Sequence, residues 1–221
     1  MRKLLMFLIV LVILLIAVDR VAVAGVERDL ATRIAATSDL SGTPTVTIEG
    51  IPFLTQAISG RYPEVRFNLG TFTYGDVPVR NLRGAAYDVT APLADIIQNR
   101  ANIHAGRVVI SGTLTRATID KYAPDGVKIG ANGERLTASG EVKLGVNRVK
   151  FDAEMRIEIA DGGIRLRAEK IKGVPDQVAG LVSYTIPFEG KLPFDVKMTK
   201  VRSVPAGMEF TAEASDVPLR G

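Results

Sequence analysis

The residues of this sequence that could perform chemistry are few and lie far apart. The chain has one histidine, His104, and no cysteine. A thiolate nucleophile, a thiolate metal site and a disulfide framework are therefore excluded. His104 lies in the segment 102–106, which we interpret as a connection before a strand, and no catalytic motif surrounds it. A surface histidine is the first interpretation, and a catalytic role is the lesser one.

The carboxylates also lack the setting of an acid–base pair. Glu154 and Glu158 alternate with apolar residues, so we expect them on the outward face of a strand, as solvated charges. The sequence contains no nucleophile elbow, zinc-protease motif, P-loop or dinucleotide fingerprint. We therefore expect no metal and no cofactor. A hydrolase would require Asp120, His104 and Glu64 to approach one another in the fold.

The charge of the chain argues against nucleic acid as a partner. The formal net charge is only +4, whereas nucleic-acid binding usually requires a strong basic patch. A mild positive charge is compatible with an anionic membrane surface.

The N-terminus carries an export signal. Two basic residues precede the 15-residue apolar run Leu4–Val18, and the small residues of 22–24 before Gly25 have the form of a cleavage site. The alternative is an uncleaved anchor over residues 4–24, although Asp19 and Arg20 interrupt it. The run Leu4–Val18 would span about 22 Å as a helix, less than the ~30 Å hydrocarbon core of a bilayer.

Both interpretations place everything after Gly25 outside the cytoplasm, in the periplasm or its equivalent. They divide the chain into a signal peptide or signal anchor, residues 1–24, and a single domain, residues 25–221. The sequence fits cleavage and anchoring about equally well.

The rest of the chain combines a few short amphipathic helices with many strands. Helices are predicted over 26–36, 53–59, 91–99, 113–122 and 174–184. Strands are predicted over 46–48, 65–69, 71–79, 85–89, 107–111, 149–159, 164–168, 192–198 and 208–214. The pattern predicts an α+β fold in which a strongly curved antiparallel sheet wraps around amphipathic helices, after the N-terminal apolar helix.

The interior of such a fold is a solid core or a groove for acyl chains. Each methylene buried in a groove contributes about 0.8 kcal/mol, and lipid binding of this kind needs no catalytic residue. The pattern alone favours the solid core. Our candidate lipid-binding residues, chosen by hydrophobicity and position, are Phe53, Leu54, Ile58, Tyr62, Phe67, Phe151, Met155, Leu181, Tyr184 and Phe194.

One segment resembles a known family. The run Gly50-Ile51-Pro52-Phe53-Leu54-Thr55-Gln56, followed by Gly60-Arg61-Tyr62, is similar to the LmeA family of actinobacterial phospholipid-binding envelope proteins. The resemblance covers about Val26 to the C-terminus. It implies a tubular lipid-binding (TULIP-like) fold and an export route. For one branch it also implies phosphatidylinositol-type lipids and a role in lipomannan maturation.

The first hypothesis is therefore an exported, non-enzymatic phospholipid-binding protein of the cell envelope, at or in the membrane. It would hold acyl chains between sheet and helices and support envelope lipid or lipoglycan metabolism. The alternatives are a scaffolding envelope domain with a filled core and, less favoured, an envelope hydrolase.

Overall fold

The computed structural model describes residues 2–37, 40–74, 77–92, 102–132, 135–144, 146–160, 163–174, 179–187 and 196–220. The helices in these ranges are α1 (Arg2–Thr37), α2 (Phe53–Ser59), α4 (Arg116–Lys121) and α5 (Ala179–Val182). The strands are β1 (Leu40–Ser41), β2 (Thr45–Ile48), β3 (Arg61–Tyr74), β4 (Val77–Thr90), β5 (Asn102–Thr115), β6 (Val127–Asn132), β7 (Arg135–Leu144), β8 (Asn147–Ala160), β9 (Gly163–Lys172), β10 (Tyr184–Pro187), β11 (Lys197–Val204) and β12 (Gly207–Arg220).

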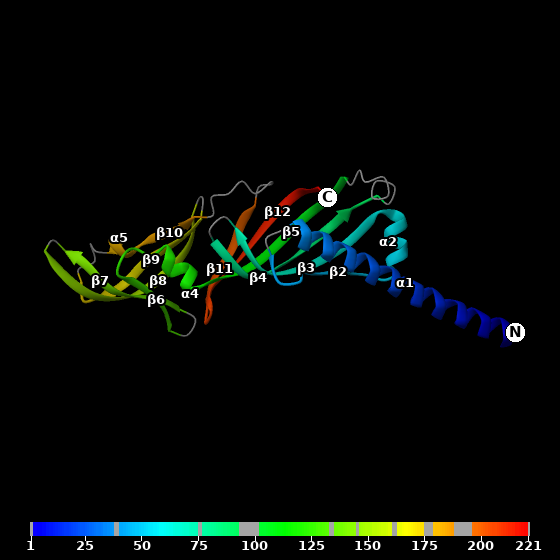
Figure 1. Ribbon diagram of the computed structural model, residues 1–221, viewed down its shortest axis with the longest axis horizontal. Helices are drawn as coiled ribbons and strands as arrows, with labels where there is room; N and C mark the ends of the chain where they lie inside the picture. The colour runs from blue at the N-terminus through cyan, green and yellow to red at the C-terminus, as the bar shows by residue number, and fades with distance from the viewer. Residues whose placement is uncertain are drawn as a thin grey trace. The chain divides into compact units, whose positions relative to one another are not determined.

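The predicted fold class is confirmed. The chain is α+β, with a long N-terminal helix, few further helices and strongly curled antiparallel sheet, consistent with a TULIP-like fold (Figure 1). The strands form two sheets. A seven-stranded sheet has the order β1-β3-β4-β5-β12-β11, with β2 paired to β3, and a five-stranded sheet has the order β10-β9-β8-β7-β6.

Two compact units make up the chain. Unit 1 comprises Met1–Gly70, Arg83–Val109 and Ala214–Gly221, and unit 2 comprises Thr71–Leu82 and Ile110–Glu213. The boundary falls within the 14-residue strands β3, β4, β5 and β12, each of which contributes residues to both units. The expected division at residues 24 and 25 stays a prediction.

Unit 1 contains α1, α2 and β2. The helix predicted over 26–36 is confirmed, but it starts earlier than expected, because α1 continues without a break from Arg2 to Thr37. Gly25 does not interrupt it, since a single glycine costs only about 1 kcal/mol in a helix. α1 contacts β2, and the Glu27 carboxylate accepts a hydrogen bond from the Ile48 backbone N–H at 2.8 Å. β2 pairs antiparallel with β3.

Unit 2 contains the five-stranded sheet and the two short helices α4 and α5. The predicted strand over 149–159 is confirmed within β8, where Phe151, Ala153 and Met155 are buried on one face. Thr115 caps α4 by accepting a hydrogen bond from the Thr118 N–H at 3.2 Å. Alternating apolar residues bury one face of the sheet because successive side chains of a strand point to opposite faces.

Three local predictions require correction. The helix expected over 113–122 covers only Arg116–Lys121, because residues 113–115 extend β5. His104 lies inside β5 and not in a connection. The helix expected to end at Tyr184 ends at Val182, and Tyr184 begins β10. Pairing with a neighbouring strand overrides local propensity at each place.

Parts of other predictions fall outside the described residues. They include residues 93–99 of the helix expected over 91–99, residues 175–178 of the helix expected over 174–184, and residues 192–195 of the strand expected over 192–198.

Candidate functional site

Residues 50–62 contain the short helix α2. Its predicted bounds, Phe53–Ser59, are confirmed. Gly50 has a positive φ of 102°, and a Cβ there would meet the Gln56 side-chain nitrogen at 2.6 Å. At the other end, Gly60 ends the helix in the left-handed conformation, and its N–H bonds to the Gln56 carbonyl. Gly50 and Gln56, the first and last residues of the family motif 50–56, thus pack against each other and shape the segment around α2.

Asp19 holds the start of α2. Its carboxylate accepts a hydrogen bond from the Leu54 backbone N–H at 2.7 Å and pairs with Arg20. Asp19 is only 3% exposed although it follows an exposed apolar run of α1. In the sequence, Asp19 is only an interruption of that run. The sequence contains one indication of this contact. A carboxylate at the end of an apolar helix is costly unless it is paired, so Asp19 requires a partner elsewhere in the fold.

The aromatic residues of this segment pack together. The ring centroids of Phe53 and Tyr62 lie 6.3 Å apart in a tilted arrangement, and both residues are buried. Burial raises the pKa of the Tyr62 phenol, because the charged form is disfavoured away from water. The structure therefore brings these two predicted site residues together in the interior of unit 1.

Leu54 and Ile58 differ from their neighbours. Leu54 is partly exposed, and Ile58 is 81% exposed. Ile58, one of the candidate lipid-binding residues, therefore does not lie in the interior of unit 1. The inward face of α2 is formed by Phe53 and Ala57 instead. Ile58 follows Ala57 directly and lies on another side of this short helix.

One face of β3 carries apolar side chains that are only half-buried: Val65, Phe67 and Leu69. Val65 lies opposite Ile48, and Phe67 lies opposite Val46, in the β2–β3 ladder. Directly opposite residues share a face of the sheet. β2 and β3 thus share one apolar face. Its side chains on β2, Ile48 and Val46, are buried, and its side chains on β3 are only half-buried.

The Phe67 ring lies close to β4. A Cβ at Gly84 would meet the tip of the Phe67 ring at 2.6 Å and the Val109 carbonyl oxygen at 2.4 Å. The absence of a side chain at Gly84 leaves room for this ring beside the strand.

The predicted site residues of unit 2 occupy different surroundings. Phe151 and Met155 are buried in its core. The Tyr184 hydroxyl donates to the Ile119 carbonyl at 3.4 Å, and burial, followed by the negative charge of Asp120, raises the pKa of that phenol. Leu181 is 55% exposed and does not lie in the core. Phe194 lies outside the described residues.

The two units differ in how completely their apolar side chains are enclosed. Among the described residues, the largest side chains that are fully buried are Leu114, Ile119, Leu136, Ile164, Leu166, Ile186, Met208, Val182, Val217 and Pro44. Eight of these ten belong to unit 2, and only Val217 and Pro44 belong to unit 1. The largest fully buried side chains therefore gather in unit 2, whereas the apolar face of β3 in unit 1 is only half-buried.

The residues considered for catalysis are engaged in structural bonds or lie apart. Glu154 binds Lys170 and Arg135 at 3.2 and 3.1 Å, and the hydrogen bond from Lys170 is the main cause that lowers the pKa of this carboxyl. Asp120 in unit 2 accepts from the Ile129 N–H at 2.7 Å.

Glu64 and His104 complete this set. Glu64 in unit 1 pairs with Arg66 at 2.7 Å, and His104 is exposed on β5. Within the described ranges, no three His, Asp or Glu side chains gather as a metal site would require.

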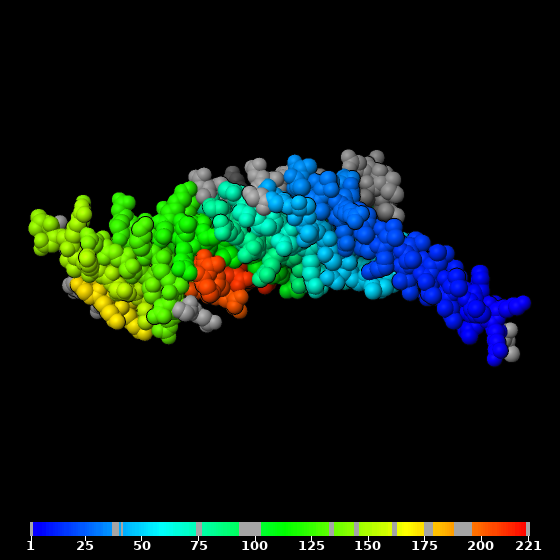
Figure 2. All heavy atoms as spheres, turned by 60° about the horizontal axis from the view of Figure 1, so that its bottom comes forward, coloured from blue at the N-terminus to red at the C-terminus, as the bar shows by residue number. Residues whose placement is uncertain are grey.

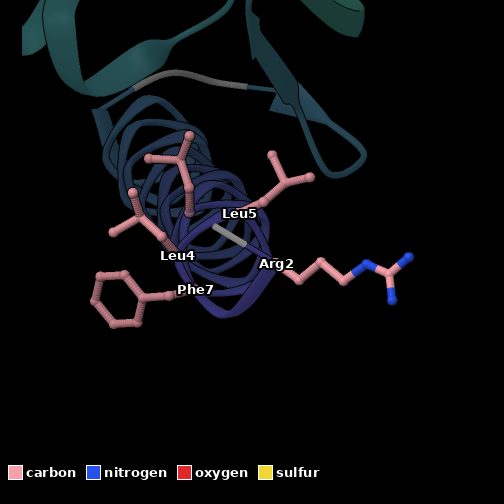
Figure 3. Close-up of a pocket in the computed structure, with 5 residues that line it drawn as sticks. Arg2, Leu4, Leu5 and Phe7 are labelled. Carbon is pink, nitrogen blue, oxygen red and sulfur yellow. The ribbon is translucent and has the colours of Figure 1, made fainter.

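The first half of α1 presents apolar side chains to solvent. α1 is long and apolar enough to cross a membrane, and its first turns are exposed in the space-filling view (Figure 2). An open depression at its start is lined by Arg2, Leu4, Leu5, Phe7 and Leu8. Figure 3 shows the labelled side chains directed outward around the helix. This surface belongs to one helix and encloses no ligand.

The long apolar helix and the strongly curled antiparallel sheet are consistent with a TULIP-like fold. The model of the LmeA-like phospholipid-binding family matches residues 17–213, and the chain belongs to this family. No curated protein and no solved structure matches the chain. The match begins before residue 24, so it includes Asp19 together with the segment of α2 that Asp19 holds.

Proposed function

We propose that this protein is an exported, non-enzymatic phospholipid-binding protein of the cell envelope. It binds acyl chains against the half-buried apolar face of β3 in unit 1, formed by Val65, Phe67 and Leu69. This open face is the observation that carries the proposal, and membership of a phospholipid-binding family supports it.

The physical argument rests on the difference between the two units. The part of these bulky apolar side chains that stays exposed lacks the hydrophobic stabilisation that burial would supply, about 25 cal/mol per Å². An acyl chain laid on this face supplies the missing burial. Eight of the ten largest fully buried side chains lie in unit 2, so the core of unit 1 is the less complete one and unit 1 is the better candidate for the lipid.

A non-enzymatic role fits the chemistry of the side chains. Glu154, Asp120 and Glu64 are each occupied by an ion pair or a backbone N–H, and Asp120 belongs to a different unit from Glu64 and His104. The hydrolase hypothesis needs these groups to converge, so it is the weaker one.

Export and anchoring follow from α1. We propose that its apolar part, led by Arg2 and Lys3, lies in the cytoplasmic membrane and leaves the rest of the chain on the outer side. The partner would be a membrane phospholipid, and a phosphatidylinositol-type headgroup is one candidate. Uncleaved α1 is favoured over a signal peptide because Asp19 is hydrogen-bonded to α2, so cleavage after Ala24 would remove a contact within unit 1.

The test is native mass spectrometry of the full-length protein released from detergent micelles. Delipidated protein is incubated with phosphatidylcholine or phosphatidylinositol, and the bound lipid is counted. We expect the wild type to regain phospholipid and Phe67→Asp to lose most of it. A wild-type protein that takes up neither lipid would overturn the proposal.

Asn68→Asp is the matched control. Asn68 is the next residue of β3 and is exposed, so the same charge is introduced on the opposite face of the same strand. Lipid occupancy should stay at the wild-type level in this variant. Equal loss in both variants would indicate a general effect on folding and not a contact with lipid.

A further inference from the structure

Two large apolar side chains near the start and end of α2 are exposed to solvent. Ile51, just before the helix, is 76% exposed, and Ile58, in its last turn, is 81% exposed. Isolated exposed apolar residues are common on proteins. These two differ because of where α2 lies.

α2 is attached to α1 at the end of the exposed apolar run. The Asp19 carboxylate binds the Leu54 N–H at 2.7 Å, and Asp19 follows directly on Val18, the last residue of that run. α2 runs crosswise to α1 at this level in the ribbon view (Figure 1). The short helix thus stands beside the point where the exposed apolar part of α1 ends.

The length of that part defines where a membrane surface would fall. Leu4 to Val18 rises about 22 Å as a helix, at about 1.5 Å per residue, and the long side chains of Arg2 and Lys3 can reach the inner headgroups from its start. If the run fills the core, Asp19 lies at the interface. α2, bonded to Asp19, then lies along that interface.

We propose that the Ile51 and Ile58 side chains insert into the outer leaflet of the phospholipid bilayer and seat unit 1 on it. This inference rests on the proposed function, in which α1 is anchored in the same membrane. The bilayer is the occupant that the geometry favours, because α2 is bonded to Asp19, which directly follows an apolar run that already requires it. A separate protein partner would have to occupy the position of the lipid headgroups.

The polar residues around the two isoleucines suit an interface. Thr55 and Ser59 are exposed on α2, and the exposed Arg61 follows the helix directly. The Arg61 guanidinium at this level can bind phosphate oxygens of headgroups. An apolar helix side flanked by polar and basic residues is typical of segments that lie in the interface plane.

The seating also gives lipid a route into unit 1. Tyr62 follows α2 after two residues, and the open face of β3 begins at Val65 in the same strand. A phospholipid that leaves the leaflet beside Ile58 would meet this face without crossing bulk water. Ile51 and Ile58 should therefore control the rate of lipid uptake and not the amount bound at equilibrium.

The first test measures insertion directly. The chain has no cysteine, so Ile58→Cys carries an environment-sensitive fluorophore at one site of the full-length protein, reconstituted in phosphatidylcholine–phosphatidylglycerol vesicles. Val146→Cys is the control, because Val146 is 99% exposed in the turn before β8 in unit 2. We expect doxyl-labelled lipids to quench the label at 58 about fivefold more than the label at 146, since only an inserted label meets them.

The second test separates docking from lipid binding. Ile51→Ser combined with Ile58→Ser should slow phospholipid uptake from vesicles about tenfold, with Val146→Ser at the wild-type rate and equal final occupancy in all three. Quenching at 58 no greater than at 146 would overturn the docking surface, whatever lipid is bound. A wild type that shows strong quenching at 58 but never takes up lipid would support docking and refute the proposed function.

Discussion

The carboxylate of Asp19 in α1 accepts a hydrogen bond from the backbone N–H of Leu54 at 2.7 Å, across 35 positions of sequence. The N-cap residue of α2 is Pro52, which has no side-chain hydrogen bond to offer. The cap that α2 lacks in its own sequence is supplied by a neighbouring helix. The segment that marks the family is thus attached to the apolar helix through one buried carboxylate.

Replacing Asp19 by Ala should release α2 from α1. The substitution leaves an N–H of the first turn without its acceptor, and loss of a capping acceptor costs about 0.5–2 kcal/mol. We expect hydrogen exchange of the α2 amides in detergent-solubilised full-length protein to accelerate about tenfold, while the β8 amides exchange as in the wild type.

Asp29→Ala is the control for this prediction. Asp29 also lies in α1, but it is exposed and pairs with Arg33 across one turn at 2.8 Å. Exposed pairs of this kind contribute only about 0.3–0.5 kcal/mol. Exchange in α2 should be unaffected, and a response equal to that of Asp19→Ala would refute the capping role.

Gly60→Ala should destabilise unit 1 by about 2 kcal/mol. Gly60 has a φ of 65°, where a side chain costs about 1–2 kcal/mol, and its new Cβ would lie 2.9 Å from the Pro92 Cα. Urea unfolding measures the loss. Gly25→Ala, in a part of α1 with no atom within 4 Å of the new Cβ, should leave stability unchanged or raise it, since Ala favours a helix.

Replacing one leucine of each unit by alanine should distinguish the packing of the two units. Leu166→Ala removes a fully buried side chain of unit 2 and should lower the free energy of unfolding by about 2–5 kcal/mol. Leu69→Ala, on the half-buried face of β3, should cost about 1 kcal/mol or less without lipid. Denaturant titration of delipidated protein compares them. Equal losses would mean that the β3 face is packed as a core and is not open.

Stability should fall at alkaline pH because of Tyr184. Burial and then Asp120 raise the pKa of this phenol above its ordinary value of 10.0. The folded state therefore holds the proton more tightly than the unfolded state. The resulting stabilisation is complete below about pH 10 and decreases as the pH rises toward the folded pKa. Urea titrations between pH 8 and 11 measure the slope, and Tyr184→Phe should make it shallower. An unchanged slope in this variant would assign the effect to other groups.

The sequence by itself determined the features that depend on neighbouring residues. The bounds of α2 follow from Pro52 before it and Gly60 after it, and the alternation of 149–159 defines a strand with one buried face. The apolar run with its basic start indicates a membrane-associated N-terminus. The motif of 50–56 indicates the family, and the family brings the fold class. Each of these signals is local, so periodicity, turn residues or a short motif can carry it.

Only the tertiary structure decided the features that depend on distant residues. It paired Asp19 with Leu54, exposed Ile58, extended β5 through His104, and left the β3 face open in unit 1 while enclosing Leu166 in unit 2. An apolar residue carries the same hydrophobicity whether a neighbour covers it or not. Whether it becomes core, lipid-contacting face or membrane-facing surface depends on which segments pack over it, and that packing brings together residues far apart in the chain.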